Sequence, residues 1–427
     1  MPSIHTTDIL EQVERLAPDL TRFIQEAVRI PSLPGHEQEF QGFLAGRLLE
    51  LGMKVTVSRV RREALAGHPA FCDDDIPFDQ RLNVIGRWPG RGGGRSLILN
   101  GHADVVSPGA EELWSDSPWS GKLDNGCIYG RGSTDMKGGL AAAVYAMESL
   151  RRLGYQPGGD VIFESVVGEE SGGCGTLATI IDGCRADAAI IMEPTRLQLA
   201  HVQSGALTFR LTVPGRAVHA CMRNRGVSAI EKFYTLLQAL SEFDARRHRE
   251  QHHDVYPDPR QVAPISIGKI SAGDWPSTVP DRLVAEGRFG VFPGEKIDKA
   301  KAAFAALIGE TAGSDDWLAR HPPALEWVEG QFEPGETAAD APILAVLGKA
   351  HAEVLGEAAQ RTGVTYGSDL RLFTNYAAMP AVLYGPGDVL HAHVVDESIA
   401  VAEVVQATKV LALTIVRWCG GGAGEEG

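Results

Sequence analysis

The chain has 427 residues, a formal net charge of −15 at pH 7 and a sequence pI of about 5.4. Its hydrophobic fraction of 44% and charged fraction of 22% are typical of a globular protein, and its length suits two domains better than one core. The acidic balance argues against a general binder of nucleic acid or of acidic membranes, but it leaves room for a local cationic site such as a bound metal.

The start of the chain lacks the charged-then-apolar layout of a signal peptide, and the sequence has no run of about 18 apolar residues that could span a membrane. The six cysteines are scattered and form no CxxC pair, which argues against a disulfide framework and against a cysteine-rich zinc site. We therefore expect a protein of the reducing cytoplasm with no membrane partner.

Helices and strands alternate through the first half of the chain. The predicted elements are helices over 7–29, 36–52 and 138–154, and strands over 53–60, 96–106, 160–167 and 188–194. The last three strands are continuous apolar runs, which is typical of strands that are covered on both faces. This alternation predicts an α/β layered domain.

The pattern changes after about residue 204. The elements that follow are strands near 205–220, 264–273, 282–295 and 324–332, with helices near 226–243 and 295–310. Their β-α-β-β-α-β order predicts a ferredoxin-like second domain. Because α/β character returns from about residue 335, we expect this domain, residues 205–330, to be inserted into a discontinuous first domain of residues 1–204 and 331–427.

Several imidazole and carboxylate side chains directly follow the predicted buried strands or lie near their ends. They are His102, Asp104, Asp135, Glu169, Glu170, Glu193 and either His391 or His393. Open α/β sheets bind ligands at the carboxyl ends of their strands, so we expect these side chains to converge. Each motif alone has an ordinary structural explanation: Asp135 could cap a helix, and adjacent glutamates usually lie in a solvated loop.

This donor set is chemically selective. Imidazole and carboxylate without thiolate suit zinc or a similar divalent ion. Two imidazoles and three carboxylates are more than one zinc needs, and they suit a pair of ions about 3.5–4 Å apart that share one carboxylate. The pattern therefore predicts a double metal site.

The order of the segments GHADVV, GRGSTDMKGG, GEESGG, EPT, GRAVHA and AHVVDE resembles the M20 family of metallopeptidases and deacylases. That family includes acetylornithine deacetylase, succinyl-diaminopimelate desuccinylase, aminoacylases and dipeptidases, and the resemblance covers nearly the whole chain. It implies an α/β, zinc-exopeptidase-like, three-layer catalytic domain with an inserted ferredoxin-like α+β domain that serves for dimerisation and as a lid.

The resemblance also implies a role for each residue of the site. Two divalent ions, zinc or alternatively cobalt, would be held by His102 and Glu193, by Glu170 and His393, and by a bridging Asp135. The family pattern of Ala-His, two residues and Asp-Glu selects His393 over His391. Asp104 would hydrogen-bond His102 and fix its ring.

The implied reaction is the hydrolysis of an amide. Glu169 would act as the general base, and His219 of the inserted domain would stabilise the oxyanion. In the family this histidine reaches the active site of the other subunit, so a homodimer is expected.

The match departs from the family pattern where many relatives hold a substrate carboxylate. Ser277 and Gly290 stand at the places of the usual asparagine and arginine, and Arg288 is either a substitute for that arginine or a surface strand residue. Ser368 and Asp369 match a Gly-Ser-Asp segment near the substrate, although a turn that caps a helix explains them equally well.

The sequence thus favours a deacylase that removes a small acyl group from an N-acylated amine or amino acid, similar to acetylornithine deacetylase or the desuccinylase. The alternatives are a deformylase of an N-formylaminopyrimidine or another non-amino-acid amide, a metallo-dipeptidase or carboxypeptidase, and a catalytically silent binding protein of the same fold.

Overall fold

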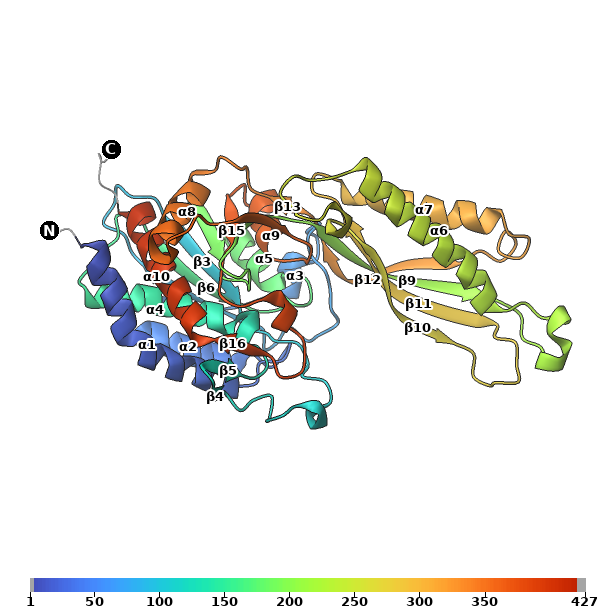
Figure 1. Cartoon of the computed structure of the whole chain (residues 1–427), viewed down its shortest axis with the longest axis horizontal. Coiled ribbons are helices and arrows are strands. Elements are labelled where there is room, and N and C mark those ends of the chain that lie inside the picture. The colour runs from blue at the N-terminus through green and yellow to red at the C-terminus, as the bar shows by residue number, and fades with distance from the viewer. Residues whose placement is uncertain (1–3, 421–427) are drawn as a thin grey trace. The chain divides into compact units, whose positions relative to one another are not determined.

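The computed structural model describes residues 4–420, and these divide into two compact units (Figure 1). Unit 1 contains the residues up to His201, Glu336–Thr362 and the residues from Ser368 onward, and unit 2 contains Val202–Gly335 and Gly363–Gly367. The short return to unit 2 was not predicted. It arises because the carbonyl oxygen of Val364 accepts hydrogen bonds from Ser204 N and from the Tyr256 hydroxyl, each at 2.9 Å.

Unit 1 is built on a mixed sheet of nine strands. Strand β3 is parallel to β6 and β7, β7 is parallel to β15, and β2 joins β1 and β6 in antiparallel pairs. In sheet order the strands are β1 (Lys54–Arg59), β2 (Leu82–Trp88), β6 (Val161–Val166), β3 (Leu97–His102), β7 (Ala188–Ile191), β15 (Ala381–Leu383), β8 (Leu199–Gln203) and β13 (Gly335–Glu336), with β14 (Arg361–Val364) also paired to β8.

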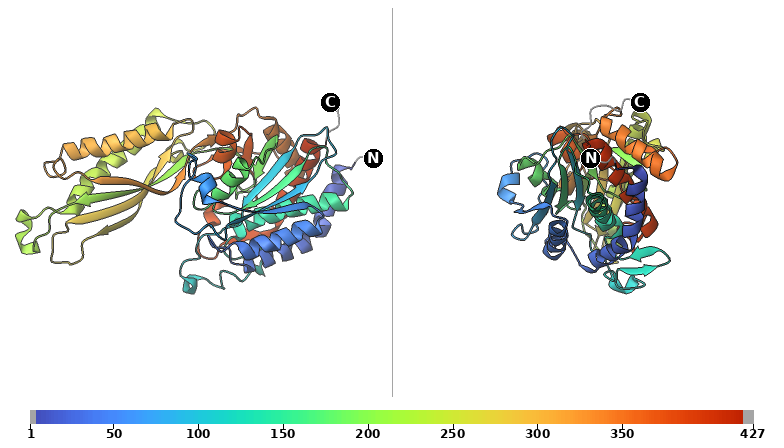
Figure 2. Two further views of the ribbon diagram at one scale, coloured as in Figure 1. Left: turned by 180° about the vertical axis from the view of Figure 1, so that it is seen from behind. Right: turned by 90° about the vertical axis from the view of Figure 1, so that its left-hand side faces the viewer.

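Helices cover both faces of this sheet, as the end-on view in Figure 2 shows. One layer contains α1 (Thr6–Arg29), α2 (Gln38–Glu50), α4 (Gly138–Arg152), α8 (Pro342–Leu355) and α10 (Val401–Cys419), and the other contains α3 (Arg62–Leu65), α5 (Cys174–Ile181) and α9 (Leu370–Tyr376). Every residue of β3, β6 and β7 is buried because both faces are covered, as their continuous apolar runs predicted. A small separate sheet joins β4 (Lys122–Asp124), β5 (Cys127–Tyr129) and β16 (Ser398–Ala400).

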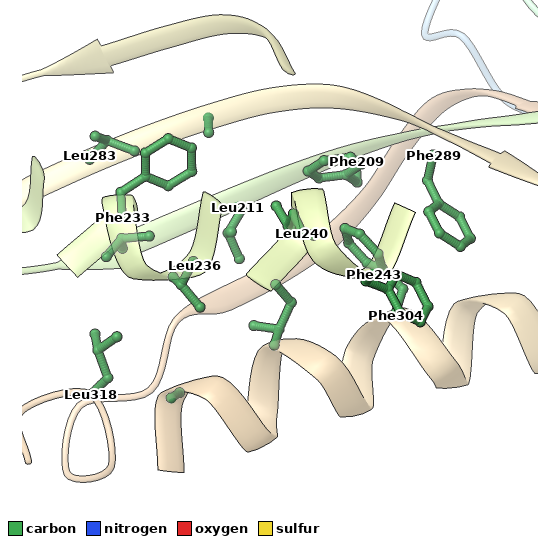
Figure 3. Close-up of a cluster of buried hydrophobic side chains, with 14 of the residues drawn as sticks. Phe209, Leu211, Phe233, Leu236, Leu240, Phe243, Leu283, Phe289, Phe304 and Leu318 are labelled. Carbon is green, nitrogen blue, oxygen red and sulfur yellow. The ribbon is translucent and has the colours of Figure 1, made fainter. Parts of the chain in front are cut away.

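Unit 2 is a four-stranded antiparallel sheet with two helices. Along the chain its elements are β9 (Gly205–Pro214), α6 (Ala229–Glu250), β10 (Ile265–Ala272), β11 (Arg282–Val291), α7 (Ile297–Gly313) and β12 (Ala324–Phe332). The sheet order is β10-β11-β9-β12, and β9 alternates buried and half-buried residues as a strand with one covered face should. Both helices pack on that face around Phe209, Phe289 and Phe304 (Figure 3).

The helices differ from the predicted ranges mainly at their ends. Helix α6 continues to Glu250, seven residues beyond the predicted end at 243. The reason is that Arg247 in this last part is buried, donating to the carbonyl oxygen of Gly290 and pairing with Glu295. No helix within residues 4–420 combines the length and the apolar character needed to cross a membrane.

Candidate metal centre

Three neighbouring parallel strands bring the predicted residues of unit 1 to one edge of the sheet. His102 is the last residue of β3, Glu169 and Glu170 lie in the turn that follows β6, and Glu193 lies two residues beyond β7. Because β6, β3 and β7 are adjacent and parallel, their carboxyl ends meet at the same edge.

Asp135 lies between the two imidazoles. Its Oδ1 is 3.0 Å from His102 Nε2, and its Oδ2 is 3.4 Å from His393 Nε2. Glu170 Oε1 lies 3.1 Å from the same His393 nitrogen, and Glu193 Oε1 lies 3.9 Å from His102 Nε2. The carboxylate of Asp135 is therefore flanked by one imidazole–carboxylate pair on each side.

Two groups among the described residues have donor atoms that all lie within 4.8 Å of one another. One is His102, Asp135 and Glu170, and the other is His102, Glu169 and Glu193. The donors are nitrogen and carboxylate oxygen, which is the chemistry that zinc and similar divalent ions bind. His102 belongs to both groups, and Asp135 lies between His102 and His393, so the residues present fit divalent cations; the role of Asp135 as the ligand shared by a pair stays a prediction.

Burial and crowding shift the pKa values of the carboxylates in the cluster. Burial raises the pKa of Glu169, Glu170 and Glu193, and the charges of neighbouring carboxylates add to each shift. Hydrogen bonds to Asp135 and Glu170 raise the pKa of His393 to about 10. A donor set of this kind is stabilised by added positive charge, as a divalent ion would supply.

Asp104 contacts His102 through its backbone carbonyl oxygen and not, as predicted, through its carboxylate. His102 Nδ1 donates to the backbone carbonyl oxygen of Asp104 at 2.8 Å, whereas the nearer carboxylate oxygen is 3.9 Å away. That carboxylate instead accepts hydrogen bonds from the backbone N–H groups of Glu169, at 3.3 Å, and Glu170, at 3.1 Å. Asp104 thus orients the ring through its backbone and the two glutamates through its side chain, leaving His102 Nε2 directed at the cluster.

A second buried carboxylate, which the sequence analysis did not single out, supports Asp135. Glu397 Oε1 accepts hydrogen bonds from the backbone N–H groups of Thr134, at 2.9 Å, and Asp135, at 3.2 Å. Its Oε2 pairs with Arg131 at 2.5 Å, and both side chains are almost completely buried. The signal was present in the AHVVDE segment, whose last residue is Glu397, but only the histidine was given a role.

Glycine is required in the turn that carries the two glutamates. Gly173 has a φ of +77°, and a Cβ there would collide with the carboxylate of Asp369. Asp369 is itself buried and accepts a hydrogen bond of 2.5 Å from Thr176 Oγ1, and burial raises the pKa of Asp369 to about 6. Ser368 is buried beside it, and its Oγ accepts from Leu370 N at 3.2 Å.

The other predicted residues lie apart from this cluster or in unit 2. His391 is exposed, and of the two candidate histidines it is His393 that contacts the carboxylates. His219 is exposed in unit 2, where its Nδ1 accepts from Cys221 N at 3.2 Å. Arg288, also in unit 2, donates to the carbonyl oxygen of Thr365, and burial lowers its pKa. The functional roles of His219, Arg288, Ser368 and Asp369 stay predictions.

Comparison with known proteins finds relatives that match most of the chain. Residues 98–417 match the model of Peptidase family M20/M25/M40. An N-formyl-4-amino-5-aminomethyl-2-methylpyrimidine deformylase of Halalkalibacterium halodurans is 33% identical over 346 residues, which are 76% of this chain and 79% of that protein. The deformylase of the same name from Bacillus subtilis is 28% identical over 417 residues, 91% of each chain. An acetylornithine deacetylase of Myxococcus xanthus is 29% identical over 349 residues, 80% of this chain and 85% of that protein.

Solved structures share the fold. A di-peptidase of Saccharomyces cerevisiae superposes with a TM-score of 0.75 at 14% sequence identity, covering 97% of this chain and 98% of that one. A dinuclear metal-binding peptidase of Bacillus subtilis superposes with a TM-score of 0.60 at 15% identity, covering 95% and 99%. With the mixed sheet of unit 1 and the four-stranded unit 2, these likenesses confirm the predicted two-domain, zinc-exopeptidase-like fold.

Proposed function

The chain belongs to peptidase family M20/M25/M40, and from that premise we propose that it is a dinuclear metal-dependent deformylase of an N-formylated aminomethylpyrimidine or of a similar heteroaromatic amide. As a member of this family the chain is a hydrolase of linear amide C–N bonds. The proposed part is the identity of that amide.

The proposal depends on Gly290, which stands where many relatives have an arginine that holds a substrate carboxylate. A Cβ at Gly290 would overlap the backbone of Ala263, so unit 2 has no room for any side chain at this position. Arg288, two residues earlier on the same strand, already donates to the carbonyl oxygen of Thr365. Both features favour a substrate without a free carboxylate, and the pyrimidine substrate for which the two deformylase relatives are named has none.

The chemistry follows from the arrangement of the cluster. Two divalent cations would be held by His102, Asp135, Glu170, Glu193 and His393. When bound, they would polarise the amide carbonyl and lower the pKa of a water molecule. Zinc is the proposed ion and cobalt the alternative, because imidazole and carboxylate donors together suit these divalent ions. Glu169 would accept a proton from the attacking water and pass it to the departing amine nitrogen, so that the formamide yields formate and a free amine.

We extend the proposal to a cytoplasmic homodimer formed through unit 2. Strand β10 is an edge strand of its sheet, and unit 2 exposes Tyr234 (60%), Ile270 (52%) and Trp275 (70%), three large side chains that are usually covered. In such a dimer, His219 of the second subunit would donate to the oxyanion. Sedimentation equilibrium tests the dimer, and a monomer at micromolar concentration would contradict it. All six cysteines lie in the described residues and are free, which suits a reducing compartment.

A substrate panel tests the proposed function. The metal-loaded protein is assayed against N-formyl-4-amino-5-aminomethyl-2-methylpyrimidine, N-acetylornithine and N-succinyl-diaminopimelate, with Glu169→Gln as the matched control. We expect the highest kcat/KM for the formylated pyrimidine, and a loss of at least about a hundredfold in Glu169→Gln with metal retained. A higher kcat/KM for either amino-acid substrate would refute the deformylase assignment, and no hydrolysis of any substrate would favour the silent binding protein.

The second candidate is a deacetylase or desuccinylase. The Myxococcus xanthus deacetylase matches 80% of the chain at 29% identity, close to the match of the Bacillus subtilis deformylase. Such a substrate carries an amino-acid carboxylate, so this candidate would require another cation in place of residue 290. The same panel distinguishes the two candidates.

A further inference from the structure

Three consecutive aspartates, Asp73, Asp74 and Asp75, differ sharply in their surroundings. The outer two face the surface, where Asp73 pairs with Arg62 and Asp75 is exposed. The side chain of Asp74 is 2% exposed and forms a buried pair with Arg81, which is 1% exposed. Burying this one carboxylate is costly, so its contacts indicate what it does.

The contacts of Asp74 lead to the turn that carries Glu169 and Glu170. Asp74 Oδ2 accepts hydrogen bonds of 2.5 Å from Ser171 Oγ and from Arg81 Nη2. Arg81 Nη1 in turn donates to Cys174 Sγ at 3.1 Å, just beyond the same turn. The loop at residues 73–75 thus holds the first residue after the two glutamates directly, and the end of the turn through Arg81.

The turn needs such support because its own backbone is permissive. Gly168, Gly172 and Gly173 have φ values of +71°, +132° and +77°, a conformation that costs glycine little but that leaves the unfixed segment much freedom. The carboxylate of Asp104 accepts hydrogen bonds from the amides of Glu169 and Glu170. Asp74 accepts one from Ser171, the next residue along the chain, so two buried aspartates hold consecutive residues of the turn.

We propose that Asp74, Ser171 and Arg81 form a clasp that positions Glu169 and Glu170 for the reaction, with Asp74 and Ser171 as positioning residues that do not touch the substrate. This inference deepens the proposed function and depends on it for the role of Glu169. The clasp itself is a property of the fold. Asp74 and Ser171 are 97 residues apart in the sequence, and the resemblance to the family implies no role for Asp74.

Amide hydrogen exchange tests the clasp without reference to catalysis. Asp74→Asn and Ser171→Ala should each speed exchange in the peptides that cover residues 168–173 of the metal-free protein, by roughly tenfold, while β3 and β6 exchange as in the wild type. Ser171→Ala leaves the Arg81–Asp74 pair intact, so it remains informative if Asp74→Asn is poorly folded. Asp73→Asn and Asp75→Asn are the matched controls and should leave exchange in this turn unchanged. Unchanged exchange in Ser171→Ala would overturn the proposal.

A double-mutant cycle tests the positioning role. In the metal-loaded enzyme each single variant should lower kcat roughly tenfold with KM within about twofold. The double variant should lose no more than Asp74→Asn alone, because that substitution already weakens the Ser171 contact as well as the Arg81 pair. Multiplying effects would overturn the positioning role, as would a change confined to KM. If the wild type hydrolyses none of the panel, the proposed function fails, but the exchange experiment still decides whether the clasp exists.

Discussion

Replacing Glu397 by glutamine should lower both the stability of the fold and the affinity of the metal centre. Glu397 accepts hydrogen bonds on both carboxylate oxygens, from Arg131 on one and from the amides of Thr134 and Asp135 on the other. Glutamine offers one oxygen and one N–H₂ group, so in either orientation its N–H₂ group faces another donor, either the Arg131 guanidinium or the two backbone amides. The change also leaves the buried guanidinium of Arg131 without its counter-charge.

The size of the effect follows from that geometry. Removing one partner of a buried ion pair costs about 3–5 kcal/mol, and Arg131 and Glu397 are 2% and 0% exposed. We therefore expect Glu397→Gln to lower the free energy of unfolding of the metal-free protein by about 3 kcal/mol. Zinc affinity should also fall by about 10- to 100-fold, because the backbone of Asp135 loses its fixed acceptor.

The double variant Arg131→Met/Glu397→Leu distinguishes the two effects. Removing both charges should restore at least half of the lost stability, since a buried ion pair can be replaced by apolar side chains at little cost. Zinc affinity should stay low, because the amides of Thr134 and Asp135 still lack an acceptor. Urea unfolding and calorimetric zinc titration measure the two quantities, with Asp396→Asn as control, a half-buried neighbour whose carboxylate contacts Ser115. A double variant less stable than Glu397→Gln, or one with wild-type zinc affinity, would refute this reasoning.

Three further changes have definite expected outcomes. Glu37→Gln should raise the free energy of unfolding by about 3 kcal/mol near pH 8 and change it little near pH 4. The reason is that burial raises the pKa of Glu37 to about 7, so the wild type loses its stabilising proton as pH rises through that value. Equal effects at both pH values would contradict this. Gly290→Ala should lower the free energy of unfolding in urea by about 1–3 kcal/mol, because the added Cβ overlaps Ala263. Gly268→Ala is the control, because a Cβ there meets no atom within 4 Å. Equal free energies of unfolding for the two variants would contradict the overlap at residue 290. Zinc at about 100 times its Kd should stabilise the chelator-treated protein by about 2.7 kcal/mol, and Asp135→Asn should lose most of this gain; a variant that keeps it would remove Asp135 from the site.

The main features of the centre follow from local sequence patterns. Apolar runs that end in His102, in the Glu169–Glu170 pair and in Glu193 predict buried strands, and the buried strands β3, β6 and β7 lie side by side and parallel. The meeting of their carboxyl ends then follows from sheet geometry alone. Residue type and the ends of the apolar runs were therefore enough to predict that His102, the two glutamates and Glu193 converge, whereas the choice of His393 over His391 came from the resemblance to the family.

The supporting contacts could not be predicted in the same way. Whether His102 bonds the carboxylate of Asp104 or its carbonyl oxygen depends on backbone torsions two residues away, and both choices leave the same sequence pattern. Asp74 and Ser171 are 97 residues apart, and nothing local distinguishes Asp74 from Asp73 or Asp75. The return of residues 363–367 to unit 2 likewise rests on long-range hydrogen bonds to Val364.

The two buried carboxylates that support the centre share one design. Asp104 accepts the backbone amides of Glu169 and Glu170, and Glu397 accepts those of Thr134 and Asp135. Each supporting carboxylate thereby fixes the main chain and leaves the side-chain oxygens of the inner acids free to face His102 and His393. The inner glutamates themselves lie in a crowded anionic region: burial raises the pKa of Glu169, Glu170 and Glu193, and neighbouring carboxylates such as Asp135 and Asp369 add to these shifts, which cations would offset. Glu397 pairs with a buried arginine at 2.5 Å, whereas the Asp104 carboxylate accepts two backbone amides and lies 3.9 Å from the His102 imidazole. Loss of the Asp104 charge should therefore cost less stability than loss of the Glu397 charge, although both should weaken metal binding.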